Sequence, residues 1–213
     1  MKDFMRRWIL LSCVIVFSSW AFAQDIIRLP APDKSASMTL FQALQDRHSE
    51  RSFSERPLSL ETLSSLLWAA TGVNRTDGHL TAPTAVNAQD ISVYVATKDG
   101  VSVYVPADNT LRKVTSTDVR KSVADRQQGV ANAPVFLIVV SDLARLGDRG
   151  DRTVILAAED AGYVSQNICL ASTALGLITV PRYTMDRDAL KQALGLTDSH
   201  RFMINHPVGY RAE

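Results

Sequence analysis

Apolar and polar residues alternate with two different periods along the first half of the chain. Apolar residues at 40, 41 and 44 predict a helix over 38–48, and Ser59 can cap a second helix, LETLSSLLWAATG, that ends at Gly72. The runs ISVYVAT and VSVYVP instead alternate every second residue on either side of KDG. This pattern predicts a β-hairpin with Asp99 and Gly100 in a tight turn.

The second half continues the mixture of helices and strands. A polar stretch over 117–128 predicts a helix, and the uninterrupted apolar run APVFLIVVS predicts a strand buried on both faces. Asp151 can cap a long helix from 152 to about 175, and the strand LITVP, a helix over 186–194 and a last strand, RFMINHPVGY, follow it. This order predicts an α+β fold, in which a mostly antiparallel or mixed central sheet is flanked by helices, rather than a doubly wound parallel sheet.

Residues 1–23 have the pattern of a cleaved signal peptide. Three basic residues precede the apolar run WILLSCVIVFSSWAFA, which ends in a small-x-small cleavage motif at 21–23. We therefore predict an exported, periplasmic protein whose mature chain begins at Gln24. The alternative is a membrane anchor that stays uncleaved, although the apolar run is short for a comfortable span.

Cleavage would change the charge and the cysteine content of the protein. The full chain of 213 residues has a formal net charge of +1, and the loss of residues 1–23 removes a net charge of +2. No overall basic field is left, which argues against a nucleic-acid partner. The mature chain also keeps a single cysteine, Cys169, which we interpret as a small buried hydrophobic residue rather than a nucleophile.

The length of the mature chain suits one well-packed domain and is short for two. Residues 24–37, with their prolines, predict an extended N-terminal arm, and residues 38–213 predict a single domain. The helix predicted from 152 onward is rich in small side chains, which let another backbone or a flat ligand approach closely. Gln166 and Asn167 follow these small residues, and their amides either tie the helix to a neighbouring loop or contact a ligand.

Most catalytic signatures are absent from the sequence. It contains no Gly-x-Ser-x-Gly elbow, no Gly-x-Gly-x-x-Gly turn and no Walker-type phosphate loop. The four histidines, at 48, 79, 200 and 206, lack the close pairing of a zinc site on a helix, so we expect no metal. If the protein is an enzyme, a cofactor must therefore carry its chemistry.

The stretch RHSER gathers groups that seek anions. Arg47 and Arg51 stand at i and i+4, so a helical turn would direct both guanidinium groups into one small volume, with His48 and Ser49 between them. A phosphate needs several such donors in a fork. The alternative is a set of ordinary exposed charges at a helix C-terminus, where cations are favoured in any case.

Four motifs, in order along the chain, resemble those of the nitroreductase family. RHSERSF is similar to the N-terminal flavin motif of that family, and APTAVNAQ is similar to its Pro-Ser-x-x-Asn loop. AGYVSQNICLASTALGLITVPR resembles its long helix with the following strand, and HPVGYR resembles its C-terminal segment. The segments LSSLLWAATGVNR, GVSVYVPADNTLRKV and APVFLIVVSD look most like the branch that includes dehydrogenases of azoline rings in modified peptides.

The resemblance implies a site for FMN. Arg47 and Arg51 would hold the phosphate and the ribityl oxygens, with hydrogen bonds from His48 and Ser49. Arg211 would be a second phosphate ligand. FMN is expected rather than FAD because the chain has no dinucleotide fingerprint.

The same resemblance implies which residues would hold the flavin ring. Asn87 would bond its pyrimidine edge, with Gln89 assisting, and the loop beneath the ring would include Pro83, Thr84 and Ala85. The backbone of Pro181, Arg182 and Tyr183 would approach N5, the atom that accepts hydride.

An FMN-dependent oxidoreductase of this kind transfers two electrons, as hydride, by a ping-pong mechanism without an obligatory side-chain acid or base. The implied acceptor is a small molecule or a peptide: a nitroaromatic, a quinone or a peptide heterocycle. The implied donor is NAD(P)H or, for an exported protein, a quinol or a redox partner. The resemblance also implies a homodimer with the flavin at its interface.

Two positions depart from the family pattern. Tyr183-Thr184 stands where many members have Glu-Gly, and Val86 stands where a glycine or another small residue is common. These departures motivate an alternative, an exported flavin-binding or ligand-binding protein of the same fold without turnover. A third possibility is a structural dimer that binds no flavin.

Overall fold

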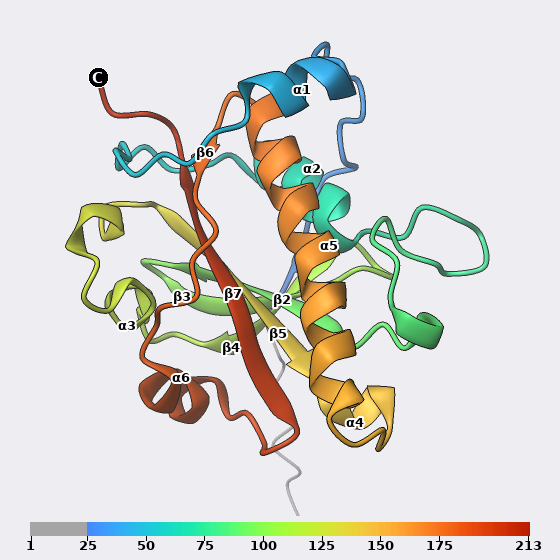
Figure 1. Ribbon diagram of the computed structural model, residues 1–213. Helices are drawn as coiled ribbons and strands as arrows, with labels where there is room; N and C mark the ends of the chain where they lie inside the picture. The colour runs from blue at the N-terminus through green and yellow to red at the C-terminus, as the bar shows by residue number, and fades with distance from the viewer. Residues whose placement is uncertain (1–24) are drawn as a thin grey trace, which may run out of the picture.

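The computed structural model describes residues 25–213, so the predicted signal peptide lies outside the described residues. Within this part of the chain, seven strands form one sheet in the order β1-β4-β3-β2-β5-β7-β6 (Figure 1). Every strand pairing is antiparallel. The strands are β1 (Ile26–Arg28), β2 (Ile91–Thr97), β3 (Gly100–Val105), β4 (Thr110–Thr115), β5 (Val135–Asp142), β6 (Ile178–Thr179) and β7 (His200–Gly209).

Helices cover both faces of the sheet, which confirms the α+β fold class. Helices α2 and α5 lie on one face, and α3 and α6 lie on the other. Helix α5 runs along the front of the sheet in Figure 1, with α1 at its upper end and α4 at its lower end. The helices are α1 (Leu40–Asp46), α2 (Leu60–Thr71), α3 (Arg120–Ala124), α4 (Leu143–Leu146), α5 (Arg152–Ala174) and α6 (Arg187–Leu194), with short 3₁₀ turns η1 (Ala85–Asn87) and η2 (Gln128–Val130).

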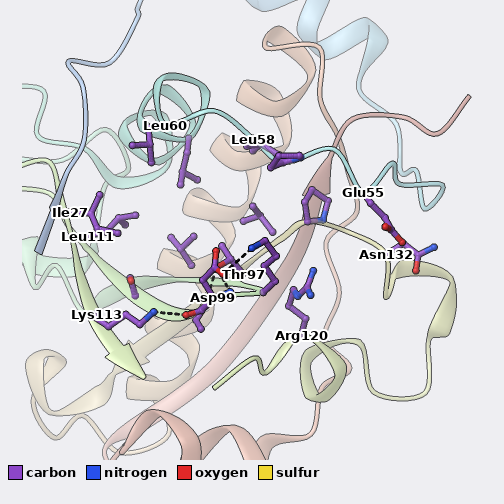
Figure 2. Close-up of a pocket in the computed structure, with 18 of the residues that line it drawn as sticks. Ile27, Glu55, Leu58, Leu60, Thr97, Asp99, Leu111, Lys113, Arg120 and Asn132 are labelled. Atoms are coloured by element: carbon purple, nitrogen blue, oxygen red, sulfur yellow. Dashed lines mark hydrogen bonds and ion pairs between the residues drawn. The ribbon is translucent and has the colours of Figure 1, made fainter. Parts of the chain in front are cut away.

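The predicted β-hairpin is confirmed, and it continues into a third strand that the sequence pattern did not reveal. The turn between β2 and β3 consists of Lys98 and Asp99 rather than the predicted Asp99 and Gly100, because Gly100 already pairs with Thr97. Strand β4, TLRKVT, adds to β3, and β1 of the N-terminal arm adds to β4 at the edge of the sheet. Between the hairpin turn and the start of α2 lies a cavity of about 590 Å³ (Figure 2).

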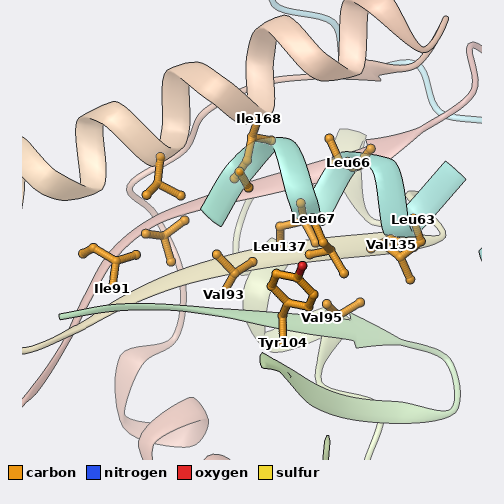
Figure 3. Close-up of a cluster of buried hydrophobic side chains, with 14 of the residues drawn as sticks. Leu63, Leu66, Leu67, Ile91, Val93, Val95, Tyr104, Val135, Leu137 and Ile168 are labelled. Carbon is orange, nitrogen blue, oxygen red and sulfur yellow. The ribbon is translucent and has the colours of Figure 1, made fainter. Parts of the chain in front are cut away.

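Helix α2 and strand β5 form the centre of the main core. Ser59 caps α2 by accepting the amide hydrogen of Thr62, and the helix ends at Gly72, as predicted. Its leucines, at 63, 66 and 67, pack against strands β2 and β5 and against Ile168 of α5 (Figure 3). Because helices cover both faces of β5, its run of apolar residues is buried almost throughout.

Three helix predictions need correction. Helix α1 ends at Asp46 rather than His48, because Arg47 is already extended and the chain turns toward β6. The polar stretch over 117–128 forms only α3 and the beginning of η2. Asp151 precedes α5 as predicted, but its side chain makes no capping hydrogen bond.

Candidate functional site

The segment that follows α1 lies beside the end of the chain. The Glu50 amide donates a 3.1 Å hydrogen bond to the carbonyl of Thr179 in β6. Phe53 forms a β-bridge with Arg211, and the Ala212 amide donates to the Ser52 carbonyl. The first and last predicted motifs therefore meet at one end of the molecule, which is the upper end in Figure 1.

Arg47 has extended backbone and Arg51 lies outside any helix, so the predicted helical turn is wrong. Arg47 lies close enough to α5 for its charge to act on Cys169, whose pKa is nevertheless raised, mainly by burial. Arg51 lies near Arg182, whose pKa is lowered mainly by its own burial and further by the Arg51 charge. Among the ion pairs of residues 25–213, none includes Arg47 or Arg51. Both guanidinium groups are therefore able to bind an external anion.

Glu50 binds two further basic side chains at this end, and sequence reasoning did not single it out. Its Oε1 lies 2.5 Å from Nε2 of His48 and also binds the guanidinium group of Arg211. His48 and Ser49 are otherwise exposed. The signal that could have identified Glu50 as the common partner of His48 and Arg211 was the presence of an acidic residue within a basic motif.

The segment 181–183 borders the same end, but Arg182 does not face it. Arg182 is buried, and its guanidinium group donates to the carbonyls of Val123 and Ala124 and to the side chains of Gln127 and Asn205, at 2.8 to 3.1 Å. Its backbone amide and carbonyl both pair with Asn205, at 2.8 and 2.7 Å. The Arg182 side chain therefore ties α3 to β7 and does not face a ligand, whereas the approach of the 181–183 backbone to flavin N5 stays a prediction.

The neighbours of Arg182 do reach the surface. Pro181 is exposed, and the side chain of Tyr183 is 72% exposed, with the Arg187 guanidinium stacked 4.2 Å from the centre of its ring. Of the predicted segment, Pro181 and Tyr183 are thus the residues that can contact a ligand.

The loop over 83–89 is strained and well anchored. Val86, Asn87 and Gln89 all have positive φ, at 51°, 54° and 47°, a conformation that costs non-glycine residues energy. The Thr84 hydroxyl accepts the Gln89 amide hydrogen at 2.9 Å, and the Gln89 side chain donates to the Gly78 carbonyl at 3.0 Å and to Asn87 Oδ1 at 3.3 Å. Pro83 and Asn87 are exposed, so the loop presents the Asn87 amide to solvent.

A buried carboxyl group on α5 holds this loop. Both oxygens of Asp160 accept the Ala85 amide hydrogen, at 3.0 and 2.9 Å, although Asp160 is only 2% exposed. Burial, together with the adjacent carboxyl of Asp90, raises the pKa of Asp160 to about 6, against the opposing hydrogen bond from Ala85.

The second buried carboxyl group, that of Asp90, lies next to Asp160. It is also buried, its Oδ2 accepts a 2.5 Å hydrogen bond from Ser141, and its Oδ1 has no hydrogen-bond partner among the described residues. A proton on Asp160 would satisfy that oxygen, and the raised pKa of Asp160 favours this protonated form in the folded chain. Sequence reasoning missed this pair because Asp90 and Asp160 meet only in the folded chain.

The predicted site residues therefore gather in two places on one protomer. Arg47 lies near Cys169, whereas the Asn87 loop is bound to Asp160. Asp160 and Cys169 are nine positions apart in α5, which corresponds to about 13 Å along the helix axis. In Figure 1 the upper group lies by α1, and the green loop with η1 lies beside the lower half of α5.

The outer sides of α1 and α5 carry exposed apolar residues next to both groups. Phe41 of α1 is 80% exposed, and Leu40 and Leu44 are exposed beside it. Val154, Ile155 and Tyr163 are exposed on α5, where the small residues Ala158 and Gly162 also face outward. Exposed apolar residues gathered on neighbouring helices are typical of a protein interface.

The other candidate reactive groups of the described residues are buried or absent. His206 is fully buried, hydrogen-bonded to Ser165 at 2.9 Å, and burial lowers its pKa to about 3. Cys169 is buried as predicted. Residues 25–213 hold no cluster of three or more potential metal ligands, and they include no helix long and apolar enough to cross a membrane.

These features define an α+β protein with unpaired arginines, among the described residues, at one end of its sheet. The sequence matches the nitroreductase family over residues 44–210, and the chain belongs to that family. It is therefore an oxidoreductase, in a family whose members typically bind a flavin.

Individual relatives agree with this membership. A candidate nitroreductase of Methanocaldococcus jannaschii is 30% identical over 202 residues, which cover 89% of this chain and 99% of the relative. The crystal structure of a candidate nitroreductase from Ralstonia eutropha has 33% identity and a TM-score of 0.83, covering 88% of this chain and 90% of that one. A chain of the Escherichia coli microcin synthetase McbBCD complex shares the fold, with 14% identity and a TM-score of 0.70, covering 97% and 85% of the two chains.

Proposed function

We propose that this protein is an FMN-dependent oxidoreductase that transfers two electrons, as hydride, from a reduced donor to an oxidised acceptor. The observation that carries this proposal is the meeting of the Arg47–Arg51 segment with Arg211 and the exposed residues of 181–183 at one end of a nitroreductase fold. The two arginines that lack an ion-pair partner fit a terminal phosphate. A dinucleotide fingerprint for FAD is absent from the sequence.

In this proposal the side chains bind and orient the cofactor and the substrates. Arg47 and Arg51 would hold the phosphate, and Arg211, kept in place by Glu50, would add a further donor. The amide of Asn87, on its anchored loop, would hydrogen-bond the edge of the ring. When bound, FMN supplies hydride transfer at N5, so no exposed acid or base is needed. The donor would leave before the acceptor binds, which is a ping-pong order.

We propose further that two copies of the chain build each site. The two groups of site residues lie about 13 Å apart along α5, so the Asn87 loop of one copy would meet the Arg47 end of the other. The exposed apolar residues of α1 and α5 would be buried between the copies. A homodimer with two equivalent sites follows.

The acceptor is proposed by chemical class. A nitroaromatic, a quinone or a peptide heterocycle could each take two electrons at such a site. The shared fold with a chain of the microcin synthetase complex, whose structure contains a truncated pro-MccB17, supports testing a peptide as well as small molecules.

The donor depends on the compartment of the protein. If residues 1–23 direct export, the mature protein works in the periplasm, and a quinol or a redox partner would replace NAD(P)H. Cell fractionation and mass spectrometry of the N-terminus test this proposal. A periplasmic chain that begins at Gln24 would support export, whereas a cytoplasmic chain with an intact N-terminus would refute it.

Steady-state kinetics test the reaction itself. The purified protein should oxidise NADPH or a quinol in the presence of a nitroaromatic or quinone acceptor, and double-reciprocal plots at several acceptor concentrations should be parallel. Arg51→Ala should lower this rate unless excess FMN is added, because it weakens cofactor binding. A yellow protein that no donor and acceptor can cycle would instead favour the flavin-binding alternative without turnover.

A further inference from the structure

The cavity between the hairpin turn and the start of α2 is separate from the proposed flavin site. Its volume is about 590 Å³, within the range of pockets that hold small organic molecules. None of the residues predicted to bind flavin lines it. Any function of this cavity is therefore independent of the proposed oxidoreductase site.

The interior of the cavity is apolar. Leu63, Val95, Leu111 and Val135, which form part of its wall, belong to the main core, so the cavity continues the core outward. Leu60 and Ile27 also line the cavity, but they are 44% and 42% exposed and form apolar lips at its edge. Figure 2 shows both of them on the same side of the cavity, together with Leu111. Such a surface favours the apolar body of a ligand over water.

Charged side chains surround part of this apolar interior. Arg120 is bound to Asp118 by two of its nitrogens, and Lys98 is paired with Asp99 at 2.9 Å. Lys113 donates to the backbone carbonyl of Asp99, and no carboxylate pairs with it among the ion pairs of residues 25–213. Lys113 is therefore a cation without a neutralising partner, placed beside an apolar cavity.

We propose that this cavity binds an amphipathic monoanion, namely a molecule with one anionic head, a carboxylate or a phosphodiester, and a long aliphatic body. The body would replace water against Leu63, Leu111 and Val135, and the anionic head would bind the Lys113 ammonium. The carboxylates of Glu55 and Asp99 also line the cavity and would repel a polyanion such as a nucleotide. A single ligand of this kind would match both features of the cavity: its anionic head would bind Lys113, and its apolar tail would contact the apolar wall.

The same chemistry could come from a free fatty acid or from an anionic lipid at a membrane surface. The exposed Ile27 and Leu60 at the edge are compatible with either source. The experiment therefore needs one arm for each source.

Isothermal titration calorimetry of the purified protein with sodium dodecanoate, below its micelle concentration, tests the proposal. We expect saturable binding of one dodecanoate per chain. Lys113→Glu should weaken it by about tenfold or more, equivalent to about 1.4 kcal/mol. Lys113→Arg should bind nearly as well as wild type. Lys121→Glu, at an exposed lysine that does not line the cavity, is the matched control and should leave the affinity unchanged.

The second arm uses vesicles of phosphatidylglycerol and a cosedimentation assay. Binding to vesicles that depends on Lys113, without binding of free dodecanoate, assigns the cavity to a lipid source. Failure of both probes would overturn the proposal. So would equal affinity for dodecyltrimethylammonium, a cation with the same tail, or equal dodecanoate binding by Lys113→Glu and Lys121→Glu proteins of intact fold by circular dichroism.

Discussion

At the residue scale, the basic side chains at the upper end of the fold differ in whether they already contact a carboxylate. Arg211 and His48 share Glu50, whereas Arg47 and Arg51 take part in no ion pair among the described residues. An incoming phosphate therefore gains most from Arg47 and Arg51, because it does not have to displace a carboxylate from either. Their side chains should contribute more to cofactor affinity than to folding.

The Arg47→Ala substitution tests this distinction. We expect FMN affinity to fall by about tenfold or more, since hydrogen bonds to charged groups contribute about 1.5–3 kcal/mol. The midpoint of thermal unfolding of the apoprotein should change little. Fluorescence titration with FMN measures the affinity, and Arg126→Ala, at a side chain that is 91% exposed, is the control. Unchanged FMN binding by the Arg47→Ala protein would show that the RHSER motif is assigned incorrectly.

The buried pair of Asp160 and Asp90 makes stability depend on pH in a defined direction. The folded-state pKa of Asp160 is raised to about 6, above its ordinary value of 3.8, so folding favours the protonated form. The stability that the proton provides is present in full below about pH 4 and is lost as the pH rises to about 6. Above pH 6 the folded protein carries the cost of a buried ionised carboxyl.

Asp160→Asn should therefore stabilise the protein at neutral pH. An asparagine carries no charge, can still accept the Ala85 amide hydrogen and can donate to Asp90 Oδ1, so we expect a gain on the order of 1–3 kcal/mol at pH 7.5. Little gain is expected at pH 4. Urea denaturation across this pH range measures the effect, with Asp108→Asn in the exposed turn between β3 and β4 as the control. A variant less stable than wild type at pH 7.5 would contradict the cost assigned to ionised Asp160.

At the element scale, local sequence patterns correctly predicted the elements that are long or have clear ends. Helix α2 has a serine cap and a glycine stop, the β2–β3 hairpin has strict alternation, and β5 is an uninterrupted apolar run. Strand β4 was missed because TLRKVT is half polar and becomes a strand by pairing with β3 and β1. The end of α1 was misplaced because the pairing of Glu50 with β6 overrides local helix preference.

The site shows the same division between local and long-range information. The sequence motifs identified the Arg47–Arg51 segment, the Asn87 loop and Arg211, each of which is a local pattern. They could not show that Arg182 turns inward to Asn205, because that bond joins residues 23 positions apart. The partners Glu50, Asp90 and Asp160 were invisible for the same reason: each acts on residues that only folding brings near.

The loop over 83–89 provides a test at this scale. Val86 is 71% exposed, so its side chain contributes little burial, yet its φ of 51° is strained for a β-branched residue. Val86→Gly should be more stable than Val86→Ala by about 0.5–1 kcal/mol, because glycine adopts this conformation freely while alanine does not. Chemical denaturation of the two variants measures the difference. A more stable alanine variant would mean that the loop is not strained at this position.

At the scale of the whole molecule, one protomer separates the two groups of site residues along α5 and leaves apolar residues of α1 and α5 exposed. Both features have a single explanation if a second copy covers this surface and completes the site. We therefore expect dimerisation and cofactor binding to be lost together.

Ile155→Glu places a charge on the exposed apolar side of α5, near the start of the helix, and should convert the dimer to a monomer that retains little FMN. Ile26→Glu, at an isoleucine of β1 that is 59% exposed, is the control and should leave the dimer intact. Sedimentation velocity with detection of flavin absorbance reports both properties at once. A wild-type monomer with full FMN occupancy would rule out the two-copy site.

The central claim is that this chain holds FMN as its redox group, and the flavin content of the purified protein tests it most directly. Protein purified without added cofactor, then denatured, should release a flavin that chromatography and mass spectrometry identify as FMN, at close to one per chain. The native protein should bleach with a reductant under anaerobic conditions and regain its colour with an electron acceptor. A colourless protein that takes up no FMN, or a protein that releases FAD, would contradict the account.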